Sequence, residues 1–142
     1  MTSTPLNPAA SFAYSDRVRE LFADLRHADS LSDVGATHAS PSAASVNRSV
    51  VAVGSREQGA TVTWSVQAKD TVIESVRYRA YGCPYFLAGC ESLARWLEGK
   101  PVAALDDWNW RDIESEFQAP PSKRSRWLLL EDAVRQLAKK LA

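Results

Sequence analysis

Apolar residues between about residue 48 and Gly82 follow one spacing, and the spacing changes after Gly82. Within residues 48–81 they recur at every second position, most clearly over 61–68, and the connections near 58–59 and 69–70 are short. A period of two is typical of strands with one buried face, and short connections favour antiparallel neighbours. The pattern therefore predicts a three-stranded antiparallel sheet, one face of which must be covered.

The segments around these strands carry the spacing of helices, with apolar residues three and four positions apart. They predict a first helix over 16–26, with Ser15 as its N-cap. The same spacing predicts a helix that ends at Gly99 and a final helix within 123–142, and a short acidic helix is expected over 106–117. The predicted fold class is α+β, a three-stranded antiparallel sheet covered on one face by helices.

Two segments show neither spacing. Residues 1–12 are small, polar and contain proline, as is typical of a disordered N-terminal tail. The stretch at about 28–47 is rich in Ser, Ala and Thr, and we expect a mobile loop there, although long loops in compact domains can also be functional. The remaining pattern predicts a single domain over 13–142.

Charge and composition limit the classes of partner. The 142 residues include 17 basic and 17 acidic side chains, so no net charge attracts nucleic acid or an anionic membrane. The chain has no apolar run of the roughly 20 residues that cross a bilayer, and its first residues lack the basic and apolar regions typical of a signal peptide. We therefore expect a cytoplasmic protein. The acidic segment 106–117 and the basic segment 123–142 either face each other or are both solvated.

One cysteine stands where a strand should end and a helix begin. Cys83 follows Tyr81-Gly82 and precedes Pro84, a residue that suits the first turn of a helix. The free backbone N–H groups and the positive end of the helix dipole at such a position favour a thiolate. Cys83 is therefore a candidate metal ligand or sulfur nucleophile, and an inert cysteine in a turn fits the same spacing.

The other potential ligands are less well placed. Cys90 lies in the apolar stripe of its helix with Leu93, which predicts a core position. It is two helical turns, about 10 Å, from Cys83, too far for a disulfide or a shared metal ion. His27 and His38 lack the spacing of metal ligands, and His27 is expected to end the first helix.

Five short motifs follow one another along the chain. They are Val34-Gly35 shortly after His27, Tyr81-Gly82-Cys83, Trp96-Leu97-Glu98-Gly99-Lys100, Pro120-Pro121-Ser122-Lys123 and Leu129-Leu130-Glu131-Asp132-Ala133. In this order they resemble the iron–sulfur cluster assembly scaffold family of the IscU and NifU N-terminal type. The resemblance runs from the first helix to the C-terminus. It implies the fold of that family and a [2Fe–2S] cluster held by three cysteines, with a nearby Asp and His.

Only one of those cysteines is matched, at Cys83. The family's Cys-Gly-Asp turn corresponds to Gln58-Gly59-Ala60, and its His-Cys pair corresponds to Ser125-Arg126. An arginine has no lone pair to give to iron. The resemblance therefore implies a [2Fe–2S] cluster or iron as the cofactor with Cys83 as the ligand, while most of the usual ligands are lost.

The resemblance also implies partners. These are a cysteine desulfurase and other iron–sulfur assembly proteins. The family's chaperone motif, Leu-Pro-Pro-Val-Lys, keeps Pro120, Pro121 and Lys123 here and loses both apolar anchors. Because buried apolar side chains supply most of the affinity at such a motif, binding of an Hsp70-type chaperone is predicted to be weak.

These observations give one leading hypothesis and two alternatives. The leading hypothesis is a scaffold-like protein of iron–sulfur cluster assembly, not itself an enzyme, with Cys83 as the remaining sulfur acceptor or iron ligand. The first alternative is a non-metal binding or regulatory module that reuses the fold. The second is a thiol-redox enzyme that uses Cys83, although no second cysteine is within reach to resolve a disulfide.

Overall fold

The computed structural model describes residues 14–28 and 46–141. Its strands are β1 (Val46–Ser55), β2 (Ala60–Lys69) and β3 (Val72–Tyr81), in the order β1-β2-β3 and antiparallel throughout. The α-helices are α2 (Asp16–Phe22), α3 (Pro84–Leu97), α4 (Trp110–Phe117) and α5 (Arg124–Leu141), and the 3-10 helices are η2 (Val102–Asp107) and η3 (Pro121–Lys123).

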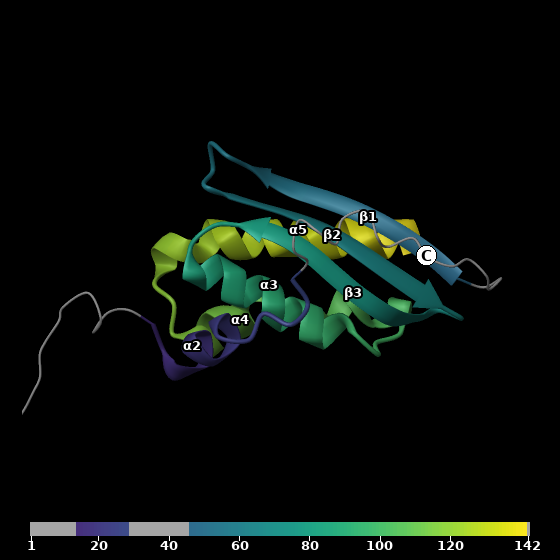
Figure 1. The fold of residues 1–142 in the computed structure, drawn as a ribbon, viewed down its shortest axis with the longest axis horizontal. Helices are drawn as coiled ribbons and strands as arrows, with labels where there is room; N and C mark the ends of the chain where they lie inside the picture. Colours follow the sequence, from purple (N-terminus) through teal and green to yellow (C-terminus); the bar gives the residue numbers. More distant parts are fainter. Residues whose placement is uncertain (1–13, 29–45, 142) are drawn as a thin grey trace, which may run out of the picture.

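The helices lie on one side of the sheet, which confirms the predicted fold class. Helix α5 packs against β1, and α3 packs against β3 (Figure 1). Residues of β2 alternate between buried and exposed positions, with Val62, Trp64 and Val66 buried and Thr63 and Ser65 exposed. The strand period of two read from the sequence is therefore the alternation between the helix-covered face and the open face.

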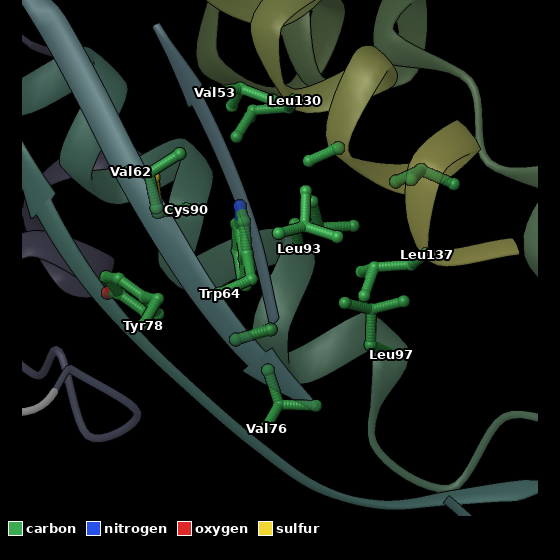
Figure 2. Close-up of a cluster of buried hydrophobic side chains, with 14 of the residues drawn as sticks. Val53, Val62, Trp64, Val76, Tyr78, Cys90, Leu93, Leu97, Leu130 and Leu137 are labelled. Carbon is green, nitrogen blue, oxygen red and sulfur yellow. The ribbon is translucent and has the colours of Figure 1, made fainter. Parts of the chain in front are cut away.

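Within the described residues, one hydrophobic core fills the space between the sheet and the two long helices. In Figure 2, Val53 of β1 lies toward Leu130 of α5, and Trp64 of β2 lies toward Leu93 of α3. Trp64, Leu93 and Leu130 are fully buried. Burial of a side chain of this size contributes roughly 1.5–3 kcal/mol, so this layer is the main source of stability of the domain.

The first helix is shorter than predicted. Helix α2 ends at Phe22 instead of 26, because the chain beyond Ala23 makes other hydrogen bonds. The backbone C=O of His27 accepts from the N–H of Tyr78 on β3, and the His27 N–H donates to the side chain of Glu91 on α3. The prediction that His27 ends this helix is therefore wrong.

The acidic segment also differs from its prediction. The structure divides 106–117 between η2 and α4, and Asn109 begins α4 by accepting a hydrogen bond from the N–H of Arg111. Glu114 of α4 accepts from Arg124 of α5 at 2.9 Å, so the acidic and basic helices meet at this pair.

Several predictions concern residues outside the described ranges. The tail 1–12, His38, Val34-Gly35 and positions 29–45 of the expected loop lie there, so the domain boundaries stay a prediction. Val46 and Asn47, which the predicted loop includes, belong to β1. In residues 14–28 and 46–141, no helix has the length and apolar character needed to cross a membrane.

Candidate functional site

Cys83 lies at the junction that the sequence predicts. It is the N-cap of α3, in extended conformation with φ −76° and ψ 167°, and Pro84 follows in the first turn. The thiol is partly exposed and makes no capping hydrogen bond. Gly82 makes the approach to the helix possible, because a Cβ there would lie 2.7 Å from the Phe86 ring. The local sequence therefore holds a partly exposed thiol at the start of a helix.

A lysine from another part of the chain contacts this thiol. The ammonium of Lys123, in η3, lies 3.6 Å from the Cys83 Sγ and donates to it. The same ammonium lies 5.7 Å from the ring centroid of Tyr85, the second residue of α3. Tyr14 packs edge-on against that ring at 4.9 Å. Thus a cation is placed beside the sulfur and supported by an aromatic ring.

The hairpin between β1 and β2 reaches the same end of the domain. Pairing of Thr61 with Tyr81 brings its turn level with the start of α3. Gly59 in this turn has φ +77°, a conformation that glycine adopts without strain. A Cβ on Gly59 would lie 3.4 Å from a terminal nitrogen of Arg126, so the turn packs against the beginning of α5.

Arg126, which the resemblance matches to the cysteine of the family's His-Cys pair, lies beside the hairpin. One terminal nitrogen donates to the Ser125 hydroxyl at 3.2 Å. Its Nε is buried, and no described residue accepts from it. Leaving a buried N–H without a partner costs roughly 1–3 kcal/mol. The structure therefore brings together the three segments that the resemblance singles out, and it presents one thiol and two cations there.

Cys90 is a core residue, as predicted. Its side chain is fully buried, and Figure 2 shows it among the apolar residues beneath the sheet. Burial raises the pKa of this thiol, and the nearby Glu91 carboxylate adds to the effect. Because the thiolate is the reactive form, Cys90 is chemically inert compared with an exposed cysteine. Both cysteines are free thiols.

The described residues hold no group of three or more His, Cys, Asp or Glu side chains that suits a metal ion. The prolines of the chaperone-like motif, Pro120 and Pro121, are exposed at the surface, whereas Lys123 is partly buried against Cys83. Sequence reasoning assigned Lys123 to this motif and to the basic segment 123–142, and it missed the contact with the thiol. The sequence position of Lys123 could have indicated this contact. Lys123 lies two residues before Ser125-Arg126, the pair that the resemblance matches to the family's His-Cys ligands.

Three comparisons relate the chain to known proteins. Residues 13–141 match the family model described as NifU-like N terminal domain. The chain is 29% identical over 84 residues to the iron–sulfur cluster assembly scaffold protein IscU of Escherichia coli K12, a match that covers 58% of this chain and 66% of that protein. It is 30% identical over 71 residues to iron sulfur cluster assembly protein 1 of Encephalitozoon cuniculi, covering about half of each chain, at 50% and 51%.

Solved structures support the same fold. The N-terminal part of a NifU-like protein from Brucella abortus superimposes with a TM-score of 0.57 at 19% identity, over 89% of this chain and 94% of that one. A protein from Fervidobacterium islandicum, described as a putative iron–sulfur cluster assembly scaffold for the SUF system, superimposes with a TM-score of 0.62 at 12% identity, over 94% and 99%. At these identities the likeness concerns the fold alone.

Proposed function

Because the chain belongs to the NifU-like N-terminal domain family, we propose that it is a scaffold-like protein of iron–sulfur cluster assembly, with Cys83 as its remaining sulfur acceptor or iron ligand. The observation that carries this proposal is the partly exposed Cys83 thiol at the start of α3, with the Lys123 ammonium 3.6 Å from its sulfur. The chain provides a site for cargo in this proposal and is not itself an enzyme.

The cargo is smaller than a complete cluster. A [2Fe–2S] cluster takes four protein ligands, usually thiolates. Cys83 is the one thiol at this end of the described residues, and Lys123 and Arg126 beside it are donors without a lone pair to offer. We therefore assign to Cys83 a single bond to sulfur or to iron.

As a sulfur acceptor, Cys83 would take its cargo from the persulfide of a cysteine desulfurase. The Cys83 thiolate attacks the terminal sulfur of that persulfide, a new S–S bond forms on Cys83, and the S–S bond of the donor breaks. The donor cysteine leaves as a thiolate, so the step needs no further oxidant or reductant. The Lys123 ammonium lies where it balances the negative charge on the sulfur. The proposed setting is the cytoplasm, with other assembly proteins as further partners and weak chaperone binding.

The test is sulfur transfer to the intact protein. The chain is incubated with a cysteine desulfurase and cysteine, and intact mass and peptide spectra show where one sulfur atom is added. We expect the added sulfur atom on Cys83. The Cys83→Ser variant should gain no sulfur, and sulfur transfer to Lys123→Gln should be slower than to the wild type. Lys139→Gln is the matched control, because Lys139 is an exposed residue of α5 remote in sequence from η3.

A second experiment measures the iron that the protein binds. Anaerobic reconstitution with iron and sulfide, followed by metal analysis and a visible spectrum, should show Cys83-dependent iron if the thiol is a ligand. Absence of both a Cys83 persulfide and Cys83-dependent iron would refute the proposal. Transfer to Cys90, which is buried in the native protein, would equally contradict it.

Arg126 favours a second function of a different class, a non-metal binding or regulatory module. Its guanidinium packs against the hairpin at Gly59 and keeps a buried N–H without a partner among the described residues. A cation of this kind suits a partner with an acidic surface. If this function holds, Cys83→Ser retains partner binding in a pull-down while Arg126→Ala loses it, the reverse of the result expected for the scaffold.

A further inference from the structure

A buried carboxylate on α3 collects hydrogen bonds from three elements. Glu91 is 0% exposed, and one of its oxygens accepts from the backbone N–H of His27 at 3.1 Å and from the Tyr78 hydroxyl at 3.0 Å. Its other oxygen lies 2.7 Å from the His27 Nδ1 and accepts from the Arg95 Nε at 2.9 Å. Burial alone would raise the pKa of Glu91, but the bonds from His27, Arg95 and Tyr78 outweigh burial and lower it.

The ring of His27 lies between two carboxylates. Its Nδ1 faces Glu91 at 2.7 Å and its Nε2 faces the carboxylate of Glu98 at 2.9 Å. An ionised carboxylate can only accept a hydrogen bond, so both contacts are hydrogen bonds only when both ring nitrogens carry a proton. A neutral imidazole carries one proton and keeps one of the two bonds.

The other charged groups around this ring are paired with one another. Arg95 on α3 lies 3.5 Å from the Asp24 carboxylate and also donates to its backbone C=O at 2.8 Å. Arg26 donates to the same carboxylate at 2.6 Å. Tyr78 on β3 contributes a neutral hydroxyl, since burial raises its pKa. Arg95 also pairs with Glu91 at 2.9 Å, so the carboxylate that faces the His27 Nδ1 is partly neutralised, whereas the carboxylate that faces Nε2 is that of Glu98.

The segment that carries His27 attaches α2 to the rest of the domain. We call residues 24–28 the strap. The strap is bonded to β3 through the His27 C=O and the Tyr78 N–H at 3.1 Å. It follows α2, whose Val18 and Leu21 are fully buried against the domain. Among the described residues, Arg95 adds a bond to the Asp24 C=O and the His27 ring adds two side-chain contacts, so the ring is one of the points at which the strap is attached.

We propose that His27 is a pH-sensitive latch, which in its doubly protonated form fastens the strap and α2 to α3 and which loosens them when the ring loses a proton. The latch is independent of the function proposed for Cys83, because no residue of that site takes part in it.

The test is amide hydrogen exchange of the intact protein, followed by mass spectrometry and corrected for the intrinsic effect of pH. Exchange is compared between about pH 5 and about pH 8, the range in which histidine side chains in general change charge. Loss of one charge-assisted hydrogen bond should lower protection of the strap and α2 about tenfold across this window. Over the same pH range, the protection of β2 and α5 against exchange should change by only a small fraction of this tenfold effect.

Two variants separate the latch from general loosening. In Glu98→Gln the side-chain amide can accept a hydrogen bond from a protonated Nε2 of His27 and can donate one to an unprotonated Nε2. The contact is therefore kept in both forms of the ring, and protection of the strap should no longer depend on pH. Glu57→Gln makes the same change of charge at an exposed position of the hairpin and should keep the wild-type dependence. Nitrogen-15 spectra of the His27 ring should show two protonated nitrogens at the acidic end and one at the basic end.

Three results would overturn the latch. The first is equal protection of the strap in the wild-type protein at both ends of the pH window. The second is a pH dependence in Glu98→Gln as large as that of the wild type. The third is a loss of protection that extends equally to β2 and α5, which would show that the whole domain responds.

Discussion

The substitution Glu91→Gln tests whether the buried carboxylate stabilises the fold. The side chain is fully buried and receives four hydrogen bonds, two on each oxygen. A glutamine of the same shape keeps one oxygen and presents an NH₂ group in place of the other. In the less costly orientation the NH₂ faces Tyr78, whose hydroxyl can turn to accept from it, and the backbone N–H of His27 loses its partner.

The expected loss follows from these contacts. A buried N–H without an acceptor costs roughly 1–3 kcal/mol, and the bonds from Arg95 and the His27 ring fall from charge-assisted to neutral strength, about 1 kcal/mol each. A neutral amide is easier to bury than a carboxylate, which offsets part of this sum. We expect Glu91→Gln to lower the free energy of unfolding by about 3 kcal/mol.

Urea unfolding, followed through the tryptophan fluorescence and the circular dichroism, measures this loss. The matched control is Glu131→Gln, which also removes one negative charge from a helix. Glu131 lies 3.5 Å from Arg135, and the Arg135 side chain is 71% exposed. A surface pair of this kind contributes about 0.3–0.5 kcal/mol. If Glu91→Gln lost no more than about 1 kcal/mol, or no more than the control, the buried network would not have the role that its geometry indicates.

Three further predictions use the same preparations. Because hydrogen bonds lower the pKa of Glu91 in the fold, its stabilisation is present above the ordinary carboxyl range and is lost as pH falls through the lowered value. The wild type should therefore lose stability more steeply than Glu91→Gln in urea titrations from about pH 5 to pH 3, and equal slopes would contradict this. In the native protein a maleimide should label Cys83 and leave the buried Cys90 unlabelled until urea unfolds the chain, and early labelling of Cys83→Ser would contradict it. Gly89→Ala should lower the free energy of unfolding by about 1–3 kcal/mol, although alanine favours helices, because its Cβ would lie 2.7 Å from the Trp127 ring. An unchanged or higher urea midpoint would refute that.

Much of the fold could be predicted because its causes are local. The alternation over 61–68 reports which side chains of β2 face the helices, and that property belongs to each residue and its neighbours two positions away. Pro84 and the glycine before Cys83 likewise mark the start of α3 within a few residues. The burial of Cys90 followed from the spacing of its helix alone.

The errors came from residues whose partners are distant in sequence. The first helix was predicted to extend to 26 because its apolar spacing continues, yet the backbone of His27 finds better partners 51 and 64 residues away, on Tyr78 and Glu91. Glu91 and Arg95, four residues apart, have the spacing of a solvent-exposed helix pair, whereas the structure buries the carboxylate.

The features of the candidate site also fall into those that the sequence predicts and those that depend on the packing of distant elements. The sequence by itself determined that a thiol stands at a helix start and that a second thiol is in the core, and it places Gln58, Ala60 and Arg126 where the resemblance expects the other ligands. Only the tertiary structure decided that Lys123 contacts Cys83 and that Arg126 packs against the hairpin at Gly59. The physical reason is that a residue's spacing reports the face it occupies on its own element, while the charge it meets there depends on how separate elements pack together.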